Sequence, residues 1–236
     1  MPSPLQDRIA FVTGASRGVG AAVARQLHAA GTRVALASRS GDDLGLDGAL
    51  GLTCDVADRA QVDAAIAATV ERFGALDIAV ANAGVGAYGD FVDLPWDKVQ
   101  AMIDINLMGT LHTARAAIPH LISRGGGDLL AVASVAGLRA FPGESVYNAS
   151  KFGQVGFIRS LDHELRDKGV RCTNICPGGV ATDFAMGDGR TPDMPELEGM
   201  MTPDEVAEVV LFALTRPRSV RILTTSFRPA GEGSWG

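Results

Sequence analysis

Short apolar segments alternate with longer stretches in which apolar residues recur at helical spacing. The short segments each stop at a glycine or a small polar residue, which is typical of buried strands. They predict strands at residues 8–13, 33–38, 50–53, 76–81, 129–133, 170–175 and 220–225. The longer stretches show the spacing of Val19, Val23 and Leu27 and predict helices. These lie at residues 18–30, 59–73, 95–106, 108–123, from the Tyr147 region to about 168, and at 206–214.

Regular alternation of strand and helix is the pattern of an α/β protein with a parallel sheet. We therefore expect a Rossmann-type doubly wound sheet of about seven strands, with helices on both faces and ligands at the carboxyl ends of the strands. Neither a linker nor a repeat interrupts the pattern, so residues 1–236 are predicted to form a single domain. The connection at 40–49 is short and rich in glycine and aspartate, which predicts an abbreviated crossover.

Composition narrows the class of protein. The chain has 236 residues, is 47% hydrophobic and carries a formal net charge of −6. It has no basic run that would favour nucleic acid or a membrane surface, and no apolar run near the roughly 20 residues that span a bilayer. The N-terminus has no apolar signal core, so a soluble, cytoplasmic protein is expected. The three cysteines are expected to be buried thiols, and the four scattered histidines predict no metal site.

The first predicted strand runs into a glycine-rich turn that opens a helix. Glycines 14, 18 and 20 allow a tight turn and a close approach of the backbone to a pyrophosphate at the helix N-terminus. The alternative is an ordinary turn, which the flanking strand and helix disfavour. We expect this turn to bind a dinucleotide through residues Gly14, Ser16, Arg17, Gly18, Val19 and Gly20.

The end of the second predicted strand distinguishes NADP(H) from NAD(H). An acidic residue there would bind a ribose 2′-hydroxyl, but this chain has Ser38 and Arg39. Arg39 is suited to a phosphate, and Arg17 can approach the same phosphate from the glycine turn. Each arginine alone would be read as a solvated surface charge. Together they favour NADP(H), although Asp42 and Asp43 nearby weigh toward NAD(H).

Tyr147 and Lys151 are spaced four residues apart, which places them on one face of a helix. Such a pair is usually an aromatic ring packed on a lysine stem. Here Ser134 ends a predicted strand upstream, and Asn82-Ala83-Gly84 and Asn106 each follow an apolar segment.

With the glycine turn, these residues resemble the short-chain dehydrogenase/reductase family in its small, single-domain form. The resemblance extends from about Arg8 to Arg228, with the motifs in the family order. It implies a catalytic set of Asn106, Ser134, Tyr147 and Lys151. It also implies that the cofactor is bordered by Asp55, Val56, Asn82, Ala83, Gly84, Tyr147, Lys151, Pro177, Gly178, Val180 and Thr182.

In that set Tyr147 would be the general acid/base. Its reference pKa of about 10 must fall by roughly three units to approach neutrality, and a cation at Lys151 is expected to lower it. Ser134 would orient the substrate oxygen. By resemblance, Lys151 would also hold the nicotinamide ribose, and Asn106 would hold a water that links Lys151 to solvent. Tyr88 lacks a lysine four residues on and is expected at the surface or the pocket rim.

The substrate is less constrained. A lid is expected at about 183–202, and apolar pocket candidates are Val135, Ala136, Leu138, Phe141, Phe184 and Met186. Arg139 and Arg190 would suit an anionic substrate, but solvated arginines are the more common case. The C-terminal residues are expected to pack on their own subunit or on a neighbour.

Our first hypothesis is a reaction between NADP(H) and the carbonyl or secondary alcohol of a small to medium apolar compound. One alternative is a 3-oxoacyl-thioester reductase of fatty-acid type, and another is a non-catalytic NADP(H)-binding sensor or scaffold. The resemblance also implies a homotetramer or homodimer.

Overall fold

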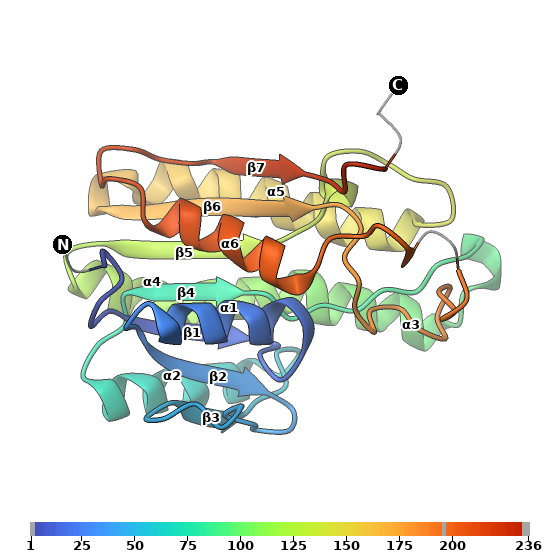
Figure 1. Cartoon of the computed structure of the whole chain (residues 1–236). Coiled ribbons are helices and arrows are strands. Elements are labelled where there is room, and N and C mark those ends of the chain that lie inside the picture. The colour runs from blue at the N-terminus through green and yellow to red at the C-terminus, as the bar shows by residue number, and fades with distance from the viewer. Residues whose placement is uncertain (1–2, 195–196, 233–236) are drawn as a thin grey trace.

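The computed structural model describes residues 3–194 and 197–232, whose strands form one parallel sheet (Figure 1). The strands follow the order β3-β2-β1-β4-β5-β6-β7, as expected of a doubly wound sheet. Their bounds are β1 Ile9–Thr13, β2 Arg33–Ser38, β3 Leu50–Thr53, β4 Ile78–Ala81, β5 Gly127–Val132, β6 Val170–Pro177 and β7 Thr224–Phe227. Because all are parallel, their carboxyl ends share one edge, where the predicted functional residues meet.

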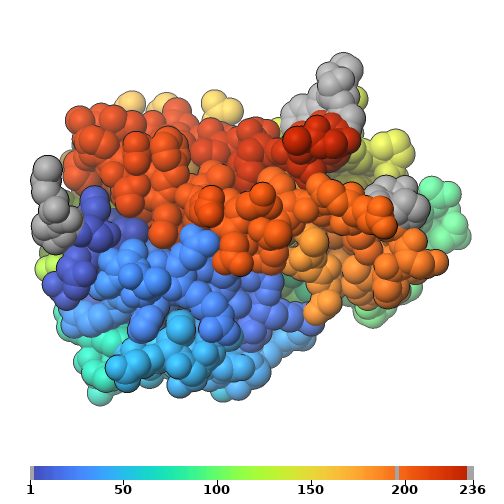
Figure 2. All heavy atoms as spheres, viewed as in Figure 1, coloured from blue at the N-terminus to red at the C-terminus, as the bar shows by residue number. Residues whose placement is uncertain are grey.

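Helices cover both faces of the sheet, as the alternating pattern predicts. Helices α1 (Gly18–Ala29) and α6 (Pro203–Leu214) pack on one face, around a core that contains Val23, Leu27 and Val210. Figure 2 shows the surfaces of α1 (blue) and α6 (orange) in contact. Helices α2 (Arg59–Phe73), α4 (Gly109–Ser123) and α5 (Ser145–Leu165) pack on the other face. Within the described residues, no helix combines the length and apolarity that a membrane span requires.

The region between β4 and β5 differs from the prediction of two separate helices. Helix α3 (Trp96–Ala101) continues without a break through a π-helical segment, η2 (Met102–Met108), into α4. Gly109 keeps a helical φ of −57°, so it does not end the helix. Asn106 was expected near a helix end, but its side chain turns toward a neighbouring loop instead of capping. A π-helical segment widens the helix locally and is frequent at functional sites.

The last strand was predicted at 220–225 but β7 begins four residues later. Side chains of β6 take the backbone carbonyls that a ladder would use: Arg171 Nη1 donates to Val220 O (3.1 Å) and Thr173 Oγ1 donates to Ile222 O (2.7 Å). Regular pairing therefore starts at Thr224, opposite Asn174. The remaining predicted strands lie within a few residues of the observed ones.

Three further 3-10 turns occur in the described residues: η1 (Phe91–Asp93), η3 (Val135–Gly137) and η4 (Arg166–Lys168). The 40–49 connection carries no helix, in line with the abbreviated crossover expected there. Several of its residues have positive φ, among them Gly41 (70°) and Leu44 (59°), so the connection is a series of tight turns.

Candidate active site

A cavity of about 1030 Å³ opens at the carboxyl edge of the sheet. It is lined by most of the residues that the sequence singles out. They are Gly14, Ser16, Arg17, Gly18, Val19, Ser38, Arg39, Asp55, Val56, Asn82, Ala83, Gly84, Ser134, Tyr147, Lys151, Pro177, Gly178, Val180 and Thr182. Gly20 and Asn106 are buried behind its wall. The fold thus collects segments from across the chain into one site.

The glycine turn forms one end of this cavity. Gly14 (φ 63°) and Gly18 (φ 55°) adopt backbone conformations that favour glycine. Gly20 packs so closely that a Cβ atom there would lie 2.3 Å from Gly14 O and 2.4 Å from Asn82 Nδ2. The N-cap of α1 is Arg17, whose side chain makes no capping hydrogen bond. Free N–H groups therefore face the cavity, and the turn fits a pyrophosphate.

Asn82 fixes this turn to the centre of the sheet. Its Nδ2 donates to Thr13 O (2.9 Å) and Gly14 O (3.3 Å), while its backbone N–H donates to Thr13 Oγ1 (3.0 Å). Ala83 N also donates to Thr13 Oγ1 (3.1 Å). The first segment after β4 is thereby tied to the end of β1.

The second strand's end presents basic groups and no carboxylate to the cavity. Arg39 and Arg17 are exposed and line its mouth. Asp42 and Asp43 do not line it, because each accepts a hydrogen bond within its own loop: Asp42 Oδ1 from Leu44 N (2.7 Å) and Asp43 Oδ1 from Gly45 N (2.9 Å). The two aspartates thus stabilise loop turns.

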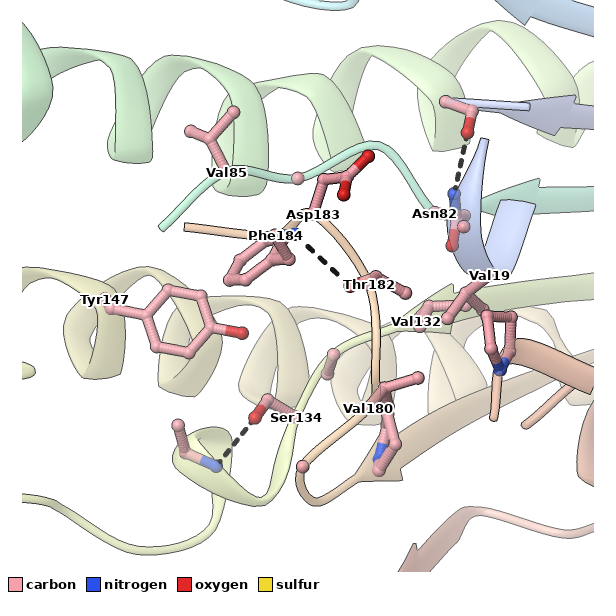
Figure 3. Close-up of a pocket in the computed structure, with 18 of the residues that line it drawn as sticks. Val19, Asn82, Val85, Val132, Ser134, Tyr147, Val180, Thr182, Asp183 and Phe184 are labelled. Atoms are coloured by element: carbon pink, nitrogen blue, oxygen red, sulfur yellow. Dashed lines mark hydrogen bonds between the residues drawn. The ribbon is translucent and has the colours of Figure 1, made fainter. Parts of the chain in front are cut away.

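At the other end of the cavity the hydroxyl group of Tyr147 points toward that of Ser134 (Figure 3). Ser134 follows β5 and accepts a hydrogen bond from Ala136 N (3.1 Å), so that it caps the short helix η3. The Ser134 hydroxyl is close enough to Tyr147 to favour its phenolate form. Figure 3 shows the Tyr147 ring, on helix α5, pointing toward Ser134 across the cavity.

Lys151 lies one helical turn from Tyr147 and is buried. Its Nζ donates to Val132 O (3.1 Å) and lies 5.6 Å from the centroid of the Tyr147 ring. Burial lowers the pKa of Lys151 to about 8. Because a buried ammonium loses its hydration, the lysine holds its proton less firmly than in water.

The expected lowering of the Tyr147 pKa is wrong for this structure. Burial raises the pKa of Tyr147, and the field of Tyr88 raises it further, while the Ser134 hydroxyl opposes them. Desolvation of the phenolate outweighs the attraction of a nearby cation. Tyr147 therefore keeps its proton, which is the form that a general acid needs.

Asn106 acts behind the cavity wall. Its Nδ2 donates to Val85 O (2.9 Å) and to Ser150 Oγ (3.0 Å), and its Oδ1 accepts from Val85 N (2.8 Å). Ser150 Oγ in turn donates to Tyr147 O (2.7 Å). The π-helical segment is thereby connected to both a cavity-lining loop and the helix that carries Tyr147. The water between Asn106 and Lys151 stays a prediction.

Further residues line the cavity near Tyr147, and among them only Glu144 had no signal in the sequence. Tyr88, expected at the surface or rim, lies edge-on to Tyr147 with ring centroids 5.7 Å apart. Phe184 lies 5.8 Å from Tyr147. Glu144 and Arg190 also line the cavity. Four of the apolar candidates line the cavity, namely Val135, Ala136, Phe141 and Phe184, whereas Leu138 and Met186 do not. The C-terminal segment adds Pro229, Gly231 and Glu232 to the lining.

The expected lid at 183–202 is fixed to the rest of the protein at both ends, leaving aside residues 195–196, which lie outside the described residues. Near its start, Tyr88 N donates to Asp188 O (2.9 Å) and Lys98 Nζ pairs with Asp188 Oδ2 (2.8 Å). Near its end, Met201 forms a β-bridge with Val180. This segment covers the side of the cavity nearest Tyr147.

Comparison with known proteins agrees with this geometry. The family model described as short chain dehydrogenase matches residues 8–193. An uncharacterized oxidoreductase of Staphylococcus aureus (strain MRSA252) is 36% identical over 95% of this chain and 98% of its own. Glycine betaine reductase of Emericella nidulans is 35% identical over 97% of this chain, which corresponds to 19% of that larger protein.

A solved structure of similar fold is the alcohol dehydrogenase from the archaeon Thermococcus sibiricus, complexed with 5-hydroxy-NADP. It is 30% identical to this chain and has a TM-score of 0.86. The match covers 98% of this chain and 100% of the other. The chain belongs to the short-chain dehydrogenase/reductase family. It is an oxidoreductase of the type that uses a nicotinamide cofactor and a small-molecule substrate.

Proposed function

We propose that the protein transfers a hydride between NADP(H) and the carbonyl or secondary alcohol of a small-molecule substrate, with Tyr147 as the general acid/base. The observation that carries this proposal is that Tyr147 points toward Ser134 (Figure 3) in a cavity whose other end is the open glycine turn. In this proposal the chain acts as one domain over residues 1–236, with 183–202 as its substrate lid.

The residues present fit the cofactor. The pyrophosphate would meet the uncapped start of α1, the adenine side would lie along Asp55 and Val56, and the nicotinamide side would lie along Val180 and Thr182. The reduced nicotinamide, when bound, supplies a hydride to the substrate carbon. The protein's own groups supply the proton and hold the reacting oxygen.

In the reduction, the substrate oxygen accepts hydrogen bonds from the Ser134 and Tyr147 hydroxyls. As negative charge grows on that oxygen, the proton on Tyr147 Oη moves to it, and the O–H bond of the alcohol product forms. The buried Lys151 ammonium lies close enough to stabilise the phenolate that remains. Burial favours the protonated form of Tyr147, which is the form that donates a proton in the reduction.

The preference for NADP(H) rests on the two arginines at the cavity mouth. Arg39 and Arg17 offer paired N–H donors suited to a 2′-phosphate. The nearby aspartates, which would favour NAD(H), have carboxylate oxygens that accept hydrogen bonds within their own loop. The alcohol dehydrogenase of similar fold was solved with an NADP derivative, which supports the same choice.

A titration of NADPH and NADH, followed by nicotinamide fluorescence, tests the cofactor assignment. We expect tighter binding of NADPH, and Arg39→Ala should weaken it by about 10- to 100-fold, since hydrogen bonds to charged groups contribute about 1.5–3 kcal/mol. The same variant should affect NADH much less. Tighter binding of NADH by the unchanged protein would refute the assignment.

The family suggests a homotetramer or homodimer, and size-exclusion chromatography with light scattering would measure the oligomeric state.

A reductase of 3-oxoacyl thioesters would be revealed by turnover of an acyl thioester. A sensor would bind NADPH without turning over any carbonyl compound.

A further inference from the structure

Arg190 is not the solvated surface residue that the sequence suggests. It is half-buried and lines the same cavity as Tyr147. Its guanidinium carbon lies 5.8 Å from the centroid of the Tyr88 ring and 5.9 Å from that of Phe184. Both rings in turn contact the ring of Tyr147. The guanidinium therefore stands one aromatic ring away from the proposed proton donor.

The backbone of this residue is held in place. Arg190 N donates to Ala185 O (3.1 Å) and Gly187 N donates to Arg190 O (2.8 Å), which closes a tight turn. The turn packs directly on Tyr88, because a Cβ at Gly189 would lie 2.6 Å from Tyr88 Cβ. Asp188, in the same turn, is paired with Lys98. Arg190 is thus presented to the cavity from an anchored segment.

The charge of Arg190 is not neutralised by a direct ion pair. Among the described residues, no carboxylate lies within 4.0 Å of its guanidinium. A cation–π contact with aromatic rings does not use the N–H groups of the guanidinium as hydrogen-bond donors, so they can bind a planar acceptor. A carboxylate is the acceptor that fits this fork with two parallel hydrogen bonds.

We propose that Arg190 binds a carboxylate of the substrate, so that the preferred carbonyl compounds are short oxo acids. This inference rests on the proposed function and names the substrate class for the same site. The short path from Arg190 through Tyr88 or Phe184 to Tyr147 requires the carboxylate and the reacting carbonyl to be close together in the molecule.

Carboxylates that line the same cavity would favour a substrate with a positive charge instead of a carboxylate. Glu144 and Glu198 both line the cavity, and Glu232 does so while paired with Arg228 (2.6 Å). Burial raises the pKa of Glu144, which weakens its competition for Arg190. An amino ketone therefore belongs in the test beside the oxo acid.

The experiment compares levulinate, its methyl ester and aminoacetone. Initial rates with NADPH give kcat/KM for the unchanged protein and for Arg190→Leu. Arg25→Leu is the control, because Arg25 is an exposed arginine on α1 away from the cavity. We expect the ratio of kcat/KM for acid over ester to fall about 10- to 100-fold in Arg190→Leu, as loss of a charge-assisted hydrogen bond implies. Arg25→Leu should leave the ratio as it was.

Calorimetry supplies a readout that does not depend on turnover. Binding of levulinate and of its ester is measured with Tyr147→Phe saturated with NADP⁺, with and without Arg190→Leu. Preference for the acid that disappears with Arg190→Leu supports the proposal. Equal affinity for acid and ester, or a preference for aminoacetone that Glu144→Gln removes, overturns it. Failure of the proposed function would instead appear as absence of carbonyl turnover by a protein that still binds levulinate through Arg190.

Discussion

Asn106 and Val85 form a reciprocal pair of hydrogen bonds between a side chain and a backbone. The Asn106 carboxamide accepts from Val85 N (2.8 Å) and donates to Val85 O (2.9 Å), so it satisfies both polar groups of one residue. Val85 lines the cavity, whereas Asn106 is fully buried in the π-helical segment. This pair therefore sets the position of the cavity wall from behind it.

Replacing Asn106 by Ala should destabilise the protein and disturb the position of this cavity wall. The change leaves Val85 N–H and C=O without their partner, and each buried unpaired group costs about 1–3 kcal/mol. We expect urea denaturation to show a loss of about 2–4 kcal/mol, together with lower kcat. The control is Gln100→Ala, on the same continuous helix, which removes an exposed hydrogen bond to Asp104. A loss no larger than that of the control would mean that the pair does not support the site.

Gly20→Ala should damage cofactor binding although Gly20 does not line the cavity. Its Cβ would collide with Gly14 O and Asn82 Nδ2, so the glycine turn must shift. We expect the Kd for NADPH, measured by fluorescence, to rise by at least about tenfold, or 1.4 kcal/mol.

The matched control is Gly156→Ala on α5, where an added Cβ meets nothing within 4 Å. That variant should gain about 0.5–1 kcal/mol of stability, because alanine is the better helix residue. Undiminished NADPH binding by Gly20→Ala would contradict the close packing at the turn.

Much of the fold was predictable because alternating apolar segments and glycine turns are local signals. The doubly wound parallel sheet and the place of Gly14, Tyr147 and Lys151 at its carboxyl edge follow from that pattern. The continuous helix through Asn106 was not predicted, and the contact of Asn106 with Val85, which is distant in sequence, has no local signal. Likewise, nothing local to Arg190 shows that its guanidinium lies near the Tyr88 ring.

The pKa of Tyr147 illustrates the same limit. The spacing to Lys151 indicates an attractive charge, but how deeply each group is buried is a property of the whole fold. Burial reverses the expected direction of the Tyr147 pKa. Sequence spacing therefore identifies the pair of residues but not its electrostatics.

The buried Lys151 makes the pH dependence of stability testable. Its pKa is about 8 in the folded protein and near the ordinary 10.5 when unfolded. Between these two pH values the unfolded chain binds more protons than the folded protein. Burial of the charged lysine therefore lowers the free energy of unfolding by its full amount below pH 8, and this loss is relieved as pH rises toward 10.5. Tyr147, with its raised pKa, acts oppositely only above about pH 10, where the unfolded tyrosine ionises.

We therefore expect the stability of Lys151→Met relative to the unchanged protein to fall with pH. Urea denaturation of the nucleotide-free proteins at pH 7 and pH 10 should show a decrease of roughly 3 kcal/mol in this difference. Tyr147 keeps its proton at both pH values in the two folded proteins because its pKa is raised, so its contribution is the same in both. A difference that does not change with pH would mean that Lys151 titrates in the folded protein as it does in water.

Tyr147→Phe tests whether Tyr147 donates the proton in a carbonyl reduction. The measurement pairs kcat for a reducible carbonyl compound with the Kd for NADPH of the same preparation. We expect kcat to fall by about 10²- to 10⁴-fold, the contribution of a positioned acid, and the Kd for NADPH to stay the same. A variant that keeps its turnover would contradict the account.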